Sequence, residues 1–446
     1  MADDRENKTT KEQSEEGSGQ DKAAQGHHVE RRKRKEGQSE APEAVRVEEG
    51  PDGEERPDEQ EREPIDRGEK AKCPIVGVGA SAGGLVALQG LFSGLKANMH
   101  AAFVVIQHRS GEHSSVMKSL LEKNTPFEVT DIEDGTEVDP GTIYLAPAGQ
   151  DVYMADGALQ LQEAHRHSSV HLPIDTFLRS LAQDEAEKAI CIILSGTGSD
   201  GTSGVKEIKG AGGMTMVQDP GQAKYDGMPQ SAIDTGMVDF ILPVEQMGER
   251  LAGYLDHPYV QRRATPDMEH ALEEQLRKIF LLIRNETGND FSHYKRSTIR
   301  RRIARRLAVH QIETLRDYIK LLHDDKDEVH NLAREMLITV TNFFRDREAF
   351  DALQKTVIEP LVEEKDPDEP IRIWVSGCAT GEEAYSIAIL VQEAMERAGK
   401  HHHVQVFATD LDDDAIGTAR RGLYPKSIAA DIAPNRLRRF FTEENS

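Results

Sequence analysis

Ser81 is the first residue whose setting points to chemistry, because Gly79-Ala80-Ser81-Ala82-Gly83 matches the pattern G-x-S-x-G. In this pattern a serine sits on a tight turn between a strand and a helix, with its hydroxyl exposed above the sheet. The backbone amide of Ala82 would then point to where an oxyanion forms. The pattern alone does not decide the function, since Gly77-x-Gly79-x-x-Ala82 also fits a dinucleotide-binding turn.

The end of the next predicted strand separates the two interpretations. A dinucleotide-binding protein would place Asp or Glu there, whereas this chain has Gln107-His108-Arg109. A histidine suits a general base that takes the proton of a serine hydroxyl. A third strand is followed by a glycine-rich loop with one acid, Asp200, that is able to orient the imidazole. The sequence therefore predicts a triad of Ser81, His108 and Asp200. Two structural alternatives stay open: His108 as a loop histidine, and Asp200 as the cap of a helix starting at Thr202.

The elements that must position these residues alternate between strand and helix. Short apolar runs typical of buried strands are followed by helical patterns, which predicts an α/β domain over residues 71–256 with a mostly parallel sheet. Predicted strands cover 74–79, 101–107, 189–195 and 214–218, and predicted helices cover 114–122 and 205–209. Added strands or a hairpin are expected at 141–146, 151–154 and 158–162.

A second strand, glycine turn and helix begin at Ile371. The turn runs from Gly377 to Gly381 and is followed by Glu382, and the next strand, 404–409, ends in Asp410. A glycine turn and an acid on the following strand suit an adenosine-ribose ligand, which leaves nicotinamide dinucleotide and S-adenosylmethionine open. Glu382 has a structural alternative, since an acid at a helix N-terminus also stabilises the helix dipole.

Four helices are predicted before this unit, at 268–284, 297–309, 315–322 and 328–336, which together indicate a small helical bundle. The second of them carries Arg301, Arg302 and Arg305 on a basic amphipathic helix. By composition alone, this helix either binds nucleic acid or exposes a solvated basic face.

Several long motifs in residues 73–256 resemble the chemotaxis receptor methylesterase family, CheB. They are VGVGASAGG at 76–84, IQH at 106–108, YLAP at 144–147, LSGTGSDGTSG at 194–204 and QDPGQAKYDGMPQSAI at 218–233. The resemblance implies hydrolysis of γ-glutamyl methyl esters on receptor helices by Ser81, His108 and Asp200, and deamidation of glutamine in some members. Thr197 stands in the oxyanion-side loop where methionine is usual, and its backbone amide can still donate. The family's usual receiver domain is not expected in the polar segment that precedes residue 71.

The segment from about 270 to 440 resembles the receptor glutamate methyltransferase family, CheR, through TVTNFFR at 339–345 and GCATGEEAYS at 377–386. This resemblance implies that S-adenosylmethionine is the cofactor. It implies that the cofactor is contacted by Thr339, Thr341, Arg345, Glu382 and Asp410. It also implies that acidic receptor helices are bound by Arg301, Arg302 and Arg305. The Asn-rich segment of the family's later strands does not follow Phe441, so we expect a partial Rossmann-like domain and weak cofactor binding.

Composition sets the remaining expectations. Residues 1–70 are almost free of aromatic and branched aliphatic side chains and are predicted to be a disordered charged tail. The formal net charge of −24 argues against nucleic-acid binding, and no apolar run is long enough to cross a membrane. The three cysteines are too scattered for a zinc site or a disulfide framework, which favours a cytoplasmic protein.

The predicted organisation is a CheB-type methylesterase at 71–256, a linker at 257–266, a CheR-type helical domain at 267–345 and a CheR-type S-adenosylmethionine-binding domain at 346–446, cut short. The expected partners are methyl-accepting chemotaxis-type receptors, with histidine kinases as further candidates. The leading hypothesis is a bifunctional receptor-modifying enzyme with no cofactor in its esterase half. Its alternative is a signalling scaffold that binds receptors or kinases without turnover.

Overall fold

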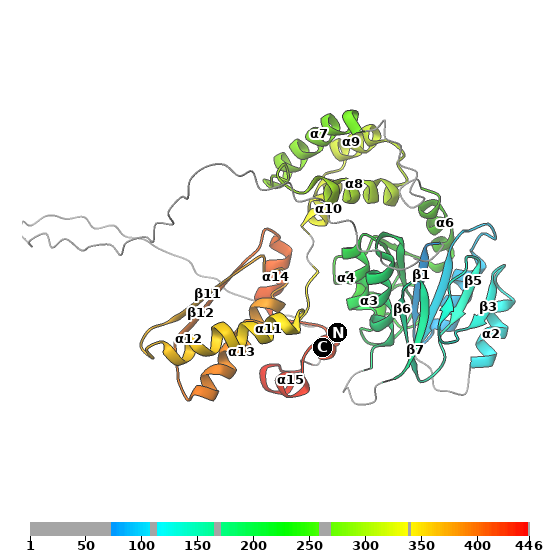
Figure 1. Cartoon of the computed structure of the whole chain (residues 1–446). Helices are drawn as coiled ribbons and strands as arrows, with labels where there is room; N and C mark the ends of the chain where they lie inside the picture. Colours follow the sequence, from blue (N-terminus) through cyan, green and yellow to red (C-terminus); the bar gives the residue numbers. More distant parts are fainter. Residues whose placement is uncertain (1–72, 108–113, 165–170, 258–268, 338–339, 445–446) are drawn as a thin grey trace, which may run out of the picture. The chain divides into compact units, whose positions relative to one another are not determined.

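The computed structural model of the chain describes residues 73–107, 114–164, 171–257, 269–337 and 340–444 (Figure 1). All described residues fall within one compact unit. The predicted tail, His108, Thr339 and residues 258–266 of the predicted linker lie outside the described part of the chain.

A seven-stranded sheet forms the centre of the first domain, in the order β10-β9-β8-β1-β2-β5-β3, with every neighbouring pair parallel. Its central strands are rich in Val and Ile and buried along almost their whole length, as expected for a parallel sheet covered on both faces. The strands are β1 (Ile75–Ala80), β2 (Ala102–Gln107), β3 (Glu128–Asp131), β5 (Thr142–Leu145), β8 (Ala189–Ile193), β9 (Met214–Gln218) and β10 (Phe240–Leu242). The predicted α/β fold is confirmed.

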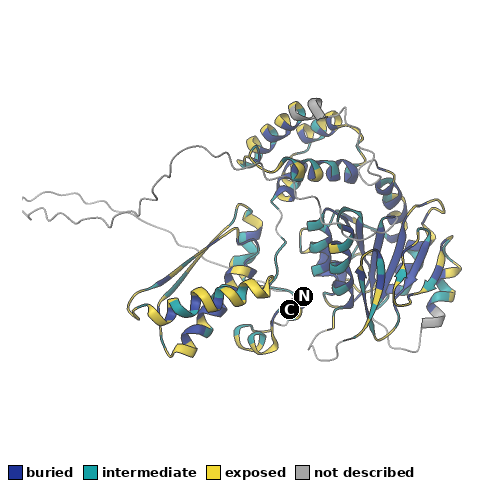
Figure 2. Cartoon of the chain, in the orientation of Figure 1, coloured by how far each residue is buried: buried dark blue, intermediate teal, exposed yellow. Residues whose placement is uncertain are grey.

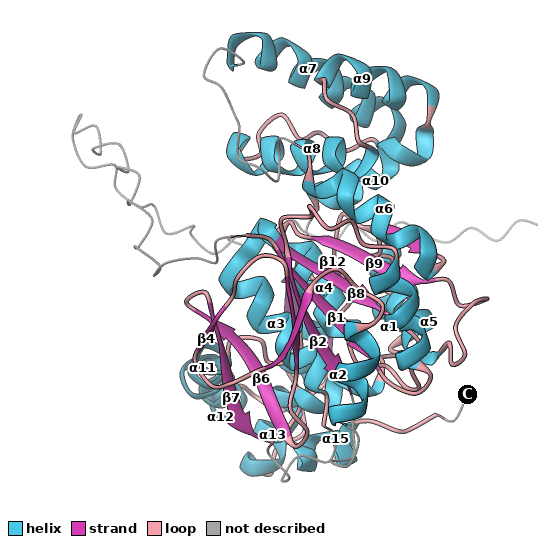
Figure 3. Ribbon diagram, turned by 90° about the vertical axis from the view of Figure 1, so that its right-hand side faces the viewer, coloured by secondary structure: helices cyan, strands magenta, loops and turns pink. Residues whose placement is uncertain are grey.

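Two layers cover this sheet, and each has its own apolar core (Figures 2 and 3). One layer contains α1 (Gly84–Ser93), α2 (Ser114–Glu122) and α6 (Val244–Leu255). The other contains α3 (Pro173–Glu185), α4 (Thr202–Ala211) and α5 (Gly227–Ile233), followed along the sheet by a small antiparallel sheet of β4 (Thr136–Glu137), β7 (Ala158–Glu163) and β6 (Gln150–Ala155). Of the added strands that the sequence predicted, one therefore joins the main sheet as β5 and two form the hairpin β6–β7.

Four helices follow, as the sequence predicted, and share one apolar core: α7 (Glu269–Thr287), α8 (Arg296–His310), α9 (Leu315–Asp324) and α10 (Lys326–Met336). Local capping fixes two of their starts. The Thr314 hydroxyl accepts the amide of Asp317 at α9, and the Asp325 carboxylate accepts the amide of Glu328 at α10. No helix in the described ranges is both long and apolar enough to cross a membrane.

The last region contains a two-stranded parallel sheet of β11 (Ile371–Ser376) and β12 (Val404–Thr409). Its helices are α11 (Arg347–Leu353), η3 (Gln354–Ile358), α12 (Glu359–Glu364), α13 (Glu382–Ala398), α14 (Asp413–Arg421), η4 (Lys426–Ala430) and α15 (Pro434–Phe440). Trp374 is 72% exposed and Phe407 is 53% exposed, so this sheet presents large apolar side chains to solvent (Figure 2).

Candidate active site

Ser81 follows the last residue of β1 and lies on the turn that leads into α1. Its amide donates to the Ser195 carbonyl oxygen at 3.0 Å, and its own carbonyl oxygen accepts the Gly84 amide at 2.9 Å. Gly83 has a φ of +74°, a backbone conformation that side chains rarely adopt, and this glycine makes the sharp turn feasible. The structure therefore gives Ser81 the strand-turn-helix setting that the G-x-S-x-G pattern predicted.

The strands that lead to the three predicted triad positions are neighbours in the sheet, because β1 lies between β8 and β2. Ala80 pairs with Gln107, so the residues just before Ser81 and His108 in the sequence lie side by side. On the other side, Gly79 pairs with Ile193, from which the chain runs on to Asp200. In a parallel sheet the loops beyond these strand ends meet at one edge, as the sequence argument required.

The loop after β8 packs directly against the serine turn. A Cβ placed on Gly196 would lie 2.9 Å from the Ser81 Cβ and 2.1 Å from the Met228 sulfur, so a larger residue here would displace Met228 and press on the serine turn. The Ser195 hydroxyl donates to the Ala82 carbonyl oxygen at 2.9 Å and accepts the Tyr225 amide at 3.0 Å. These bonds tie the serine turn, the loop after β8 and the start of α5 together.

Ala82 and Thr197, the two predicted oxyanion donors, lie on these two joined loops. Among the hydrogen bonds between described residues, neither backbone amide donates to a protein acceptor. Thr197 is exposed, so its side chain meets solvent while its amide belongs to the loop that contacts Ser81. Amides in this situation are available to a developing negative charge.

Asp200 is buried and accepts backbone hydrogen bonds with both carboxylate oxygens. Its Oδ2 accepts the Ile174 amide at 3.0 Å, and its Oδ1 accepts the amides of Asp175 and Gly201, each at 2.9 Å. Asp200 therefore does cap a helix, but this helix is α3 and not the predicted one that begins at Thr202. Capping α3 and orienting a histidine are compatible roles, because each carboxylate oxygen has two lone pairs.

The second predicted site lies at the carboxyl edge of the two-stranded sheet, where Ser376 pairs with Thr409. The Asp410 carboxylate accepts the Ala379 amide at 2.8 Å and the Asp412 amide at 2.9 Å, which joins the two strand ends. Glu382 is buried at the start of α13 and accepts the Thr380 hydroxyl at 2.5 Å. Burial raises the pKa of Glu382, against the lowering effects of the Thr380 hydrogen bond and the Lys206 charge.

The remaining predicted cofactor residues have different surroundings. Thr341 is half-buried, whereas Arg345 is exposed and donates to the Val340 carbonyl oxygen at 2.8 Å. A cavity of about 1040 Å³ borders Thr380 and Glu382, and its wall includes Lys206 of α4. The glycine turn and the acid on the next strand suit an adenosine-ribose ligand.

Three family models match parts of the chain. Residues 76–251 match the CheB methylesterase family, residues 274–337 match the all-alpha domain of CheR methyltransferase, and residues 339–446 match its SAM binding domain. The chain therefore contains a region similar to CheB methylesterase and regions similar to CheR methyltransferase. It joins a CheB methylesterase domain to CheR methyltransferase domains, which confirms the resemblance drawn from the sequence motifs.

Individual proteins show the same likeness. An uncharacterized 104.1 kDa protein in the hypE 3′ region of Rhodobacter capsulatus is 39% identical over 349 residues, which cover 73% of this chain and 36% of that protein. A protein-glutamate methylesterase/protein-glutamine glutaminase of Halobacterium salinarum is 31% identical over 189 residues, covering 41% of this chain and 54% of that protein. The chain thus spans between about a third and about half of the length of these relatives.

Among solved structures, the catalytic domain of the Thermotoga maritima CheB methylesterase is 30% identical. The match covers 41% of this chain and 98% of that chain, with a TM-score of 0.38.

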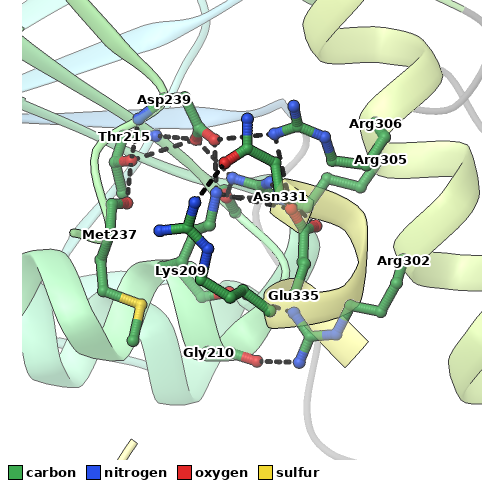
Figure 4. A network of polar contacts seen from close by, with 12 residues as sticks. Lys209, Gly210, Thr215, Met237, Asp239, Arg302, Arg305, Arg306, Asn331 and Glu335 are labelled. Atoms are coloured by element: carbon green, nitrogen blue, oxygen red, sulfur yellow. Dashed lines mark hydrogen bonds and ion pairs between the residues drawn. The ribbon is translucent and has the colours of Figure 1, made fainter. Parts of the chain in front are cut away.

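The basic helix α8 was expected to expose its arginines as a receptor-docking surface, but two of them are buried (Figure 4). Arg305 is 0% exposed: its Nε and Nη2 donate to the Gly213 carbonyl oxygen at 2.8 and 2.7 Å, and its Nη1 donates to Glu335 at 2.9 Å. Arg302 is also buried and donates to the carbonyl oxygens of Lys209 and Gly210. The expectation that Arg302 and Arg305 bind a receptor is therefore corrected, since both guanidinium groups bind the CheB domain instead.

Arg301 is exposed and is the one member of the predicted arginine set that this arrangement leaves accessible. The composition of α8 did not distinguish it from its neighbours, because the helix is basic on several faces. Contacts distant in sequence, between α8 and the end of α4, decide which arginines are buried.

A buried network of charges surrounds Arg305 (Figure 4). Arg305 also pairs with Asp239, whose other carboxylate oxygen accepts Lys209 Nζ at 2.5 Å, and Lys209 Nζ lies 3.5 Å from Glu335. Burial alone would raise the pKa of Asp239 and Glu335, but Arg305, Lys209 and Arg306 together hold both below their ordinary values. Burial lowers the pKa of Lys209.

Sequence reasoning missed Asp175, a buried acid of α3 beside Asp200. Its carboxylate accepts the Gly204 amide at 2.7 Å. One signal was available, since Pro173-Ile174-Asp175 has proline at the first helical position and an acid in the first turn. That signal predicts a helix start, but not that the helix would meet Asp200.

Proposed function

We propose that the CheB domain hydrolyses γ-glutamyl methyl esters of methyl-accepting chemotaxis-type receptors, with Ser81, His108 and Asp200 as its triad. The observation that carries the proposal is the position of Ser81, on a nucleophile turn at the end of β1 and against the loop that ends in Asp200. The printed name of the Halobacterium salinarum relative, a protein-glutamate methylesterase/protein-glutamine glutaminase, supports the substrate class.

The reaction that this arrangement suits is acyl transfer. The Ser81 oxygen attacks the γ-carbonyl carbon of the ester while His108 takes the hydroxyl proton. The C–O bond to the methoxy group then breaks, and the proton passes from His108 to that oxygen, releasing methanol. Water attacks the acyl-serine with the same base, which regenerates Ser81 and leaves glutamate.

Two backbone amides would stabilise the tetrahedral intermediate, those of Ala82 and Thr197. Both belong to loops that meet at Ser81, and neither donates to an acceptor among the described residues. Because the donor is the amide, threonine in place of the family's usual methionine leaves this interaction intact. The threonine side chain would instead affect how the substrate fits.

The same site suits deamidation of a glutamine side chain, in which ammonia takes the place of methanol as the leaving group. A scaffold without turnover is the alternative from a different class. The protein would then bind receptors or histidine kinases through the same surfaces, and loss of Ser81 would leave its function unchanged. We place either activity in the cytoplasm, where receptor signalling helices are accessible.

For the CheR domains, we propose S-adenosylmethionine as the methyl donor for receptor glutamates. When bound, the cofactor supplies an electrophilic methyl group. Glu382 and Asp410 would hold its polar groups at the carboxyl edge of β11 and β12, with Thr339, Thr341 and Arg345 as further contacts. Arg301 is the exposed residue of α8 that is left to meet an acidic receptor helix.

The test of the esterase proposal uses the purified full chain and receptor-containing membranes with labelled methyl esters. Ser81→Ala is expected to lower methanol release by about 10⁶-fold, as loss of a triad nucleophile does. Ser93→Ala is the matched control, because its exposed hydroxyl only accompanies the end of α1 by donating to the Gly90 carbonyl oxygen. Unchanged release by Ser81→Ala would reject the triad and favour the scaffold.

The exposed sheet of the CheR domain leads to a prediction for the cofactor. Since Trp374 and Phe407 are open to solvent, this chain encloses an adenosine ligand only in part. We expect calorimetry to give a dissociation constant for S-adenosylmethionine weaker than about 1 μM. An affinity tighter than that value would show that the residues present suffice for the site.

A further inference from the structure

The carboxylates of Asp175 and Asp200 each accept backbone amides from the first turn of the helix next to the other residue. Asp200, in the loop before α4, accepts the amides of Ile174 and Asp175 in the first turn of α3 at 3.0 and 2.9 Å. Asp175 accepts the amide of Gly204 in the first turn of α4 at 2.7 Å. Asp200 therefore caps α3, the helix that carries Asp175, and Asp175 caps α4, the helix that follows Asp200. Both residues are only 3% exposed.

Close packing of the two helices holds this exchange in place. A Cβ placed on Gly204 would lie 2.5 Å from the Leu178 Cβ, so α3 and α4 touch where glycine leaves room. Asp200 consequently has little freedom to move along or around either helix. Its position relative to the Ser81 turn is then fixed by α3 as well as by its own loop.

The two carboxylates are also coupled through their charge. Burial first, and then the neighbouring Asp200, raise the pKa of Asp175 to about 8. The groups that face Asp175 from the surrounding elements have opposite effects on this pKa. Arg179 on α3 and the Gly204 amide on α4 lower it, whereas Asp431 of the CheR domain raises it further. The raised pKa of Asp175 favours the neutral acid, whose oxygen still accepts the Gly204 amide.

We propose that Asp175 is a positioning residue of the esterase, which holds Asp200 in place through the paired caps of α3 and α4. The inference rests on the proposed function and deepens it by adding a residue behind the triad. Ionisation of Asp175 places a second buried negative charge beside Asp200, and repulsion between like charges loosens the exchange of hydrogen bonds. Methanol release should accordingly fall as the pH rises through about 8.

The experiment compares pH profiles of methanol release by the full chain. Asp175→Asn keeps an oxygen that accepts the Gly204 amide but cannot ionise. We expect this variant to match the wild type near neutral pH and to lack the decrease around pH 8. The same decrease in Asp175→Asn and in the wild type would overturn the proposal.

A second variant tests the positioning itself. Asp175→Ala removes the acceptor and is expected to lower kcat by about 10- to 100-fold with KM nearly unchanged, corresponding to loss of a hydrogen bond to a buried charged pair. Asp184→Asn is the matched control. Asp184 also lies on α3 and accepts two backbone amides, those of Asp156 and Gly157, but at the other end of the helix.

The outcomes separate the two proposals. If Ser81→Ala abolishes release while Asp175→Ala and Asp175→Asn behave as wild type at every pH, the esterase stands and the role of Asp175 is rejected. If Ser81→Ala retains full release, the proposed function itself fails. Positioning is supported if Asp175→Ala lowers kcat but unfolds at the same temperature as the wild type, and if Asp175→Asn also shows the altered pH profile.

Discussion

The two ends of α4 each hold a pair of buried acids, and the two pairs differ in what neutralises them. At the N-terminal end, Asp175 and Asp200 bind backbone amides. At the C-terminal end, Asp239 and Glu335 bind Arg305 and Lys209. Both arrangements complement the helix dipole, since acids lie at the amide end and cations lie at the carbonyl end.

The pKa of Asp175 is shifted in the opposite direction from the pKa values of Asp239 and Glu335. Arg305, Lys209 and Arg306 keep the pKa of Asp239 and Glu335 low despite burial. For Asp175, burial and the neighbouring Asp200 outweigh the charge of Arg179, and its pKa rises. Burial and a helix start are thus not enough to keep a second acid charged. The number of neighbouring cations decides whether a buried acid is a structural anion or a group that titrates in the working pH range.

This difference matches the position of each pair in the molecule. The cation-rich pair lies between the CheB domain and helices α8 and α10, where constant charge favours a permanent contact (Figure 4). The cation-poor pair lies behind the proposed triad, where a change in charge is able to affect catalysis. One helix, α4, therefore connects a structural charge network with the active-site loop.

The largest expected effect on stability concerns the cation-rich pair. Asp239→Ala removes the acceptor of Arg305 and Lys209 and leaves buried cations without it, which is expected to lower the free energy of unfolding by about 3–5 kcal/mol. Chemical denaturation checks this value. The control is Asp234→Ala, an exposed acid a few residues away, for which a change below about 0.5 kcal/mol is expected. Equal effects of the two substitutions would contradict the account.

The next effect concerns the cation-poor pair and its pH dependence. The folded-state pKa of Asp175 is raised from 3.8 to about 8, so its contribution to stability is complete below the unfolded value and is lost as the pH rises through the folded one. Between about pH 6 and about pH 8 the wild type should lose about 2 kcal/mol relative to Asp175→Asn. Parallel stability curves for the two proteins would show that Asp175 does not titrate there.

The smallest effect is expected at Arg301, the exposed arginine of the three predicted docking residues. Arg301→Ala is expected to change the free energy of unfolding by less than about 0.5 kcal/mol, because this side chain lies outside the buried network. Arg305→Ala should behave like Asp239→Ala instead. A pull-down with receptor fragments at low and high salt then tests Arg301 alone as a docking residue, without damage to the domain contact.

Much of the fold could be predicted from the sequence, because the spacing of apolar residues and the glycine turns are local signals. The strands 371–376, 404–409 and 214–218 have the predicted limits, and the four helices of the bundle lie where apolar periodicity placed them. The general rule for parallel sheets also predicted that the loops after β1 and β8 meet, as they do where Gly196 approaches Ser81.

The remaining features depend on contacts between residues far apart in sequence. Nothing in the RRIARR segment marks Arg305 as buried, since its partners Gly213 and Asp239 lie about 90 and about 66 positions away in another domain. Likewise, Asp175 gains its role only when α3 meets α4. Helix-start signals predict an acid at that position and say nothing of the second acid beside it.

The measurement that tests the central claim most directly is hydrolysis in ¹⁸O-labelled water, with receptor peptides analysed by mass spectrometry. Acyl transfer through Ser81 predicts that the wild-type protein places one ¹⁸O atom in the new glutamate carboxylate and releases unlabelled methanol, and that Ser81→Ala converts no ester. Label in the methanol, or unchanged conversion by Ser81→Ala, would contradict the account.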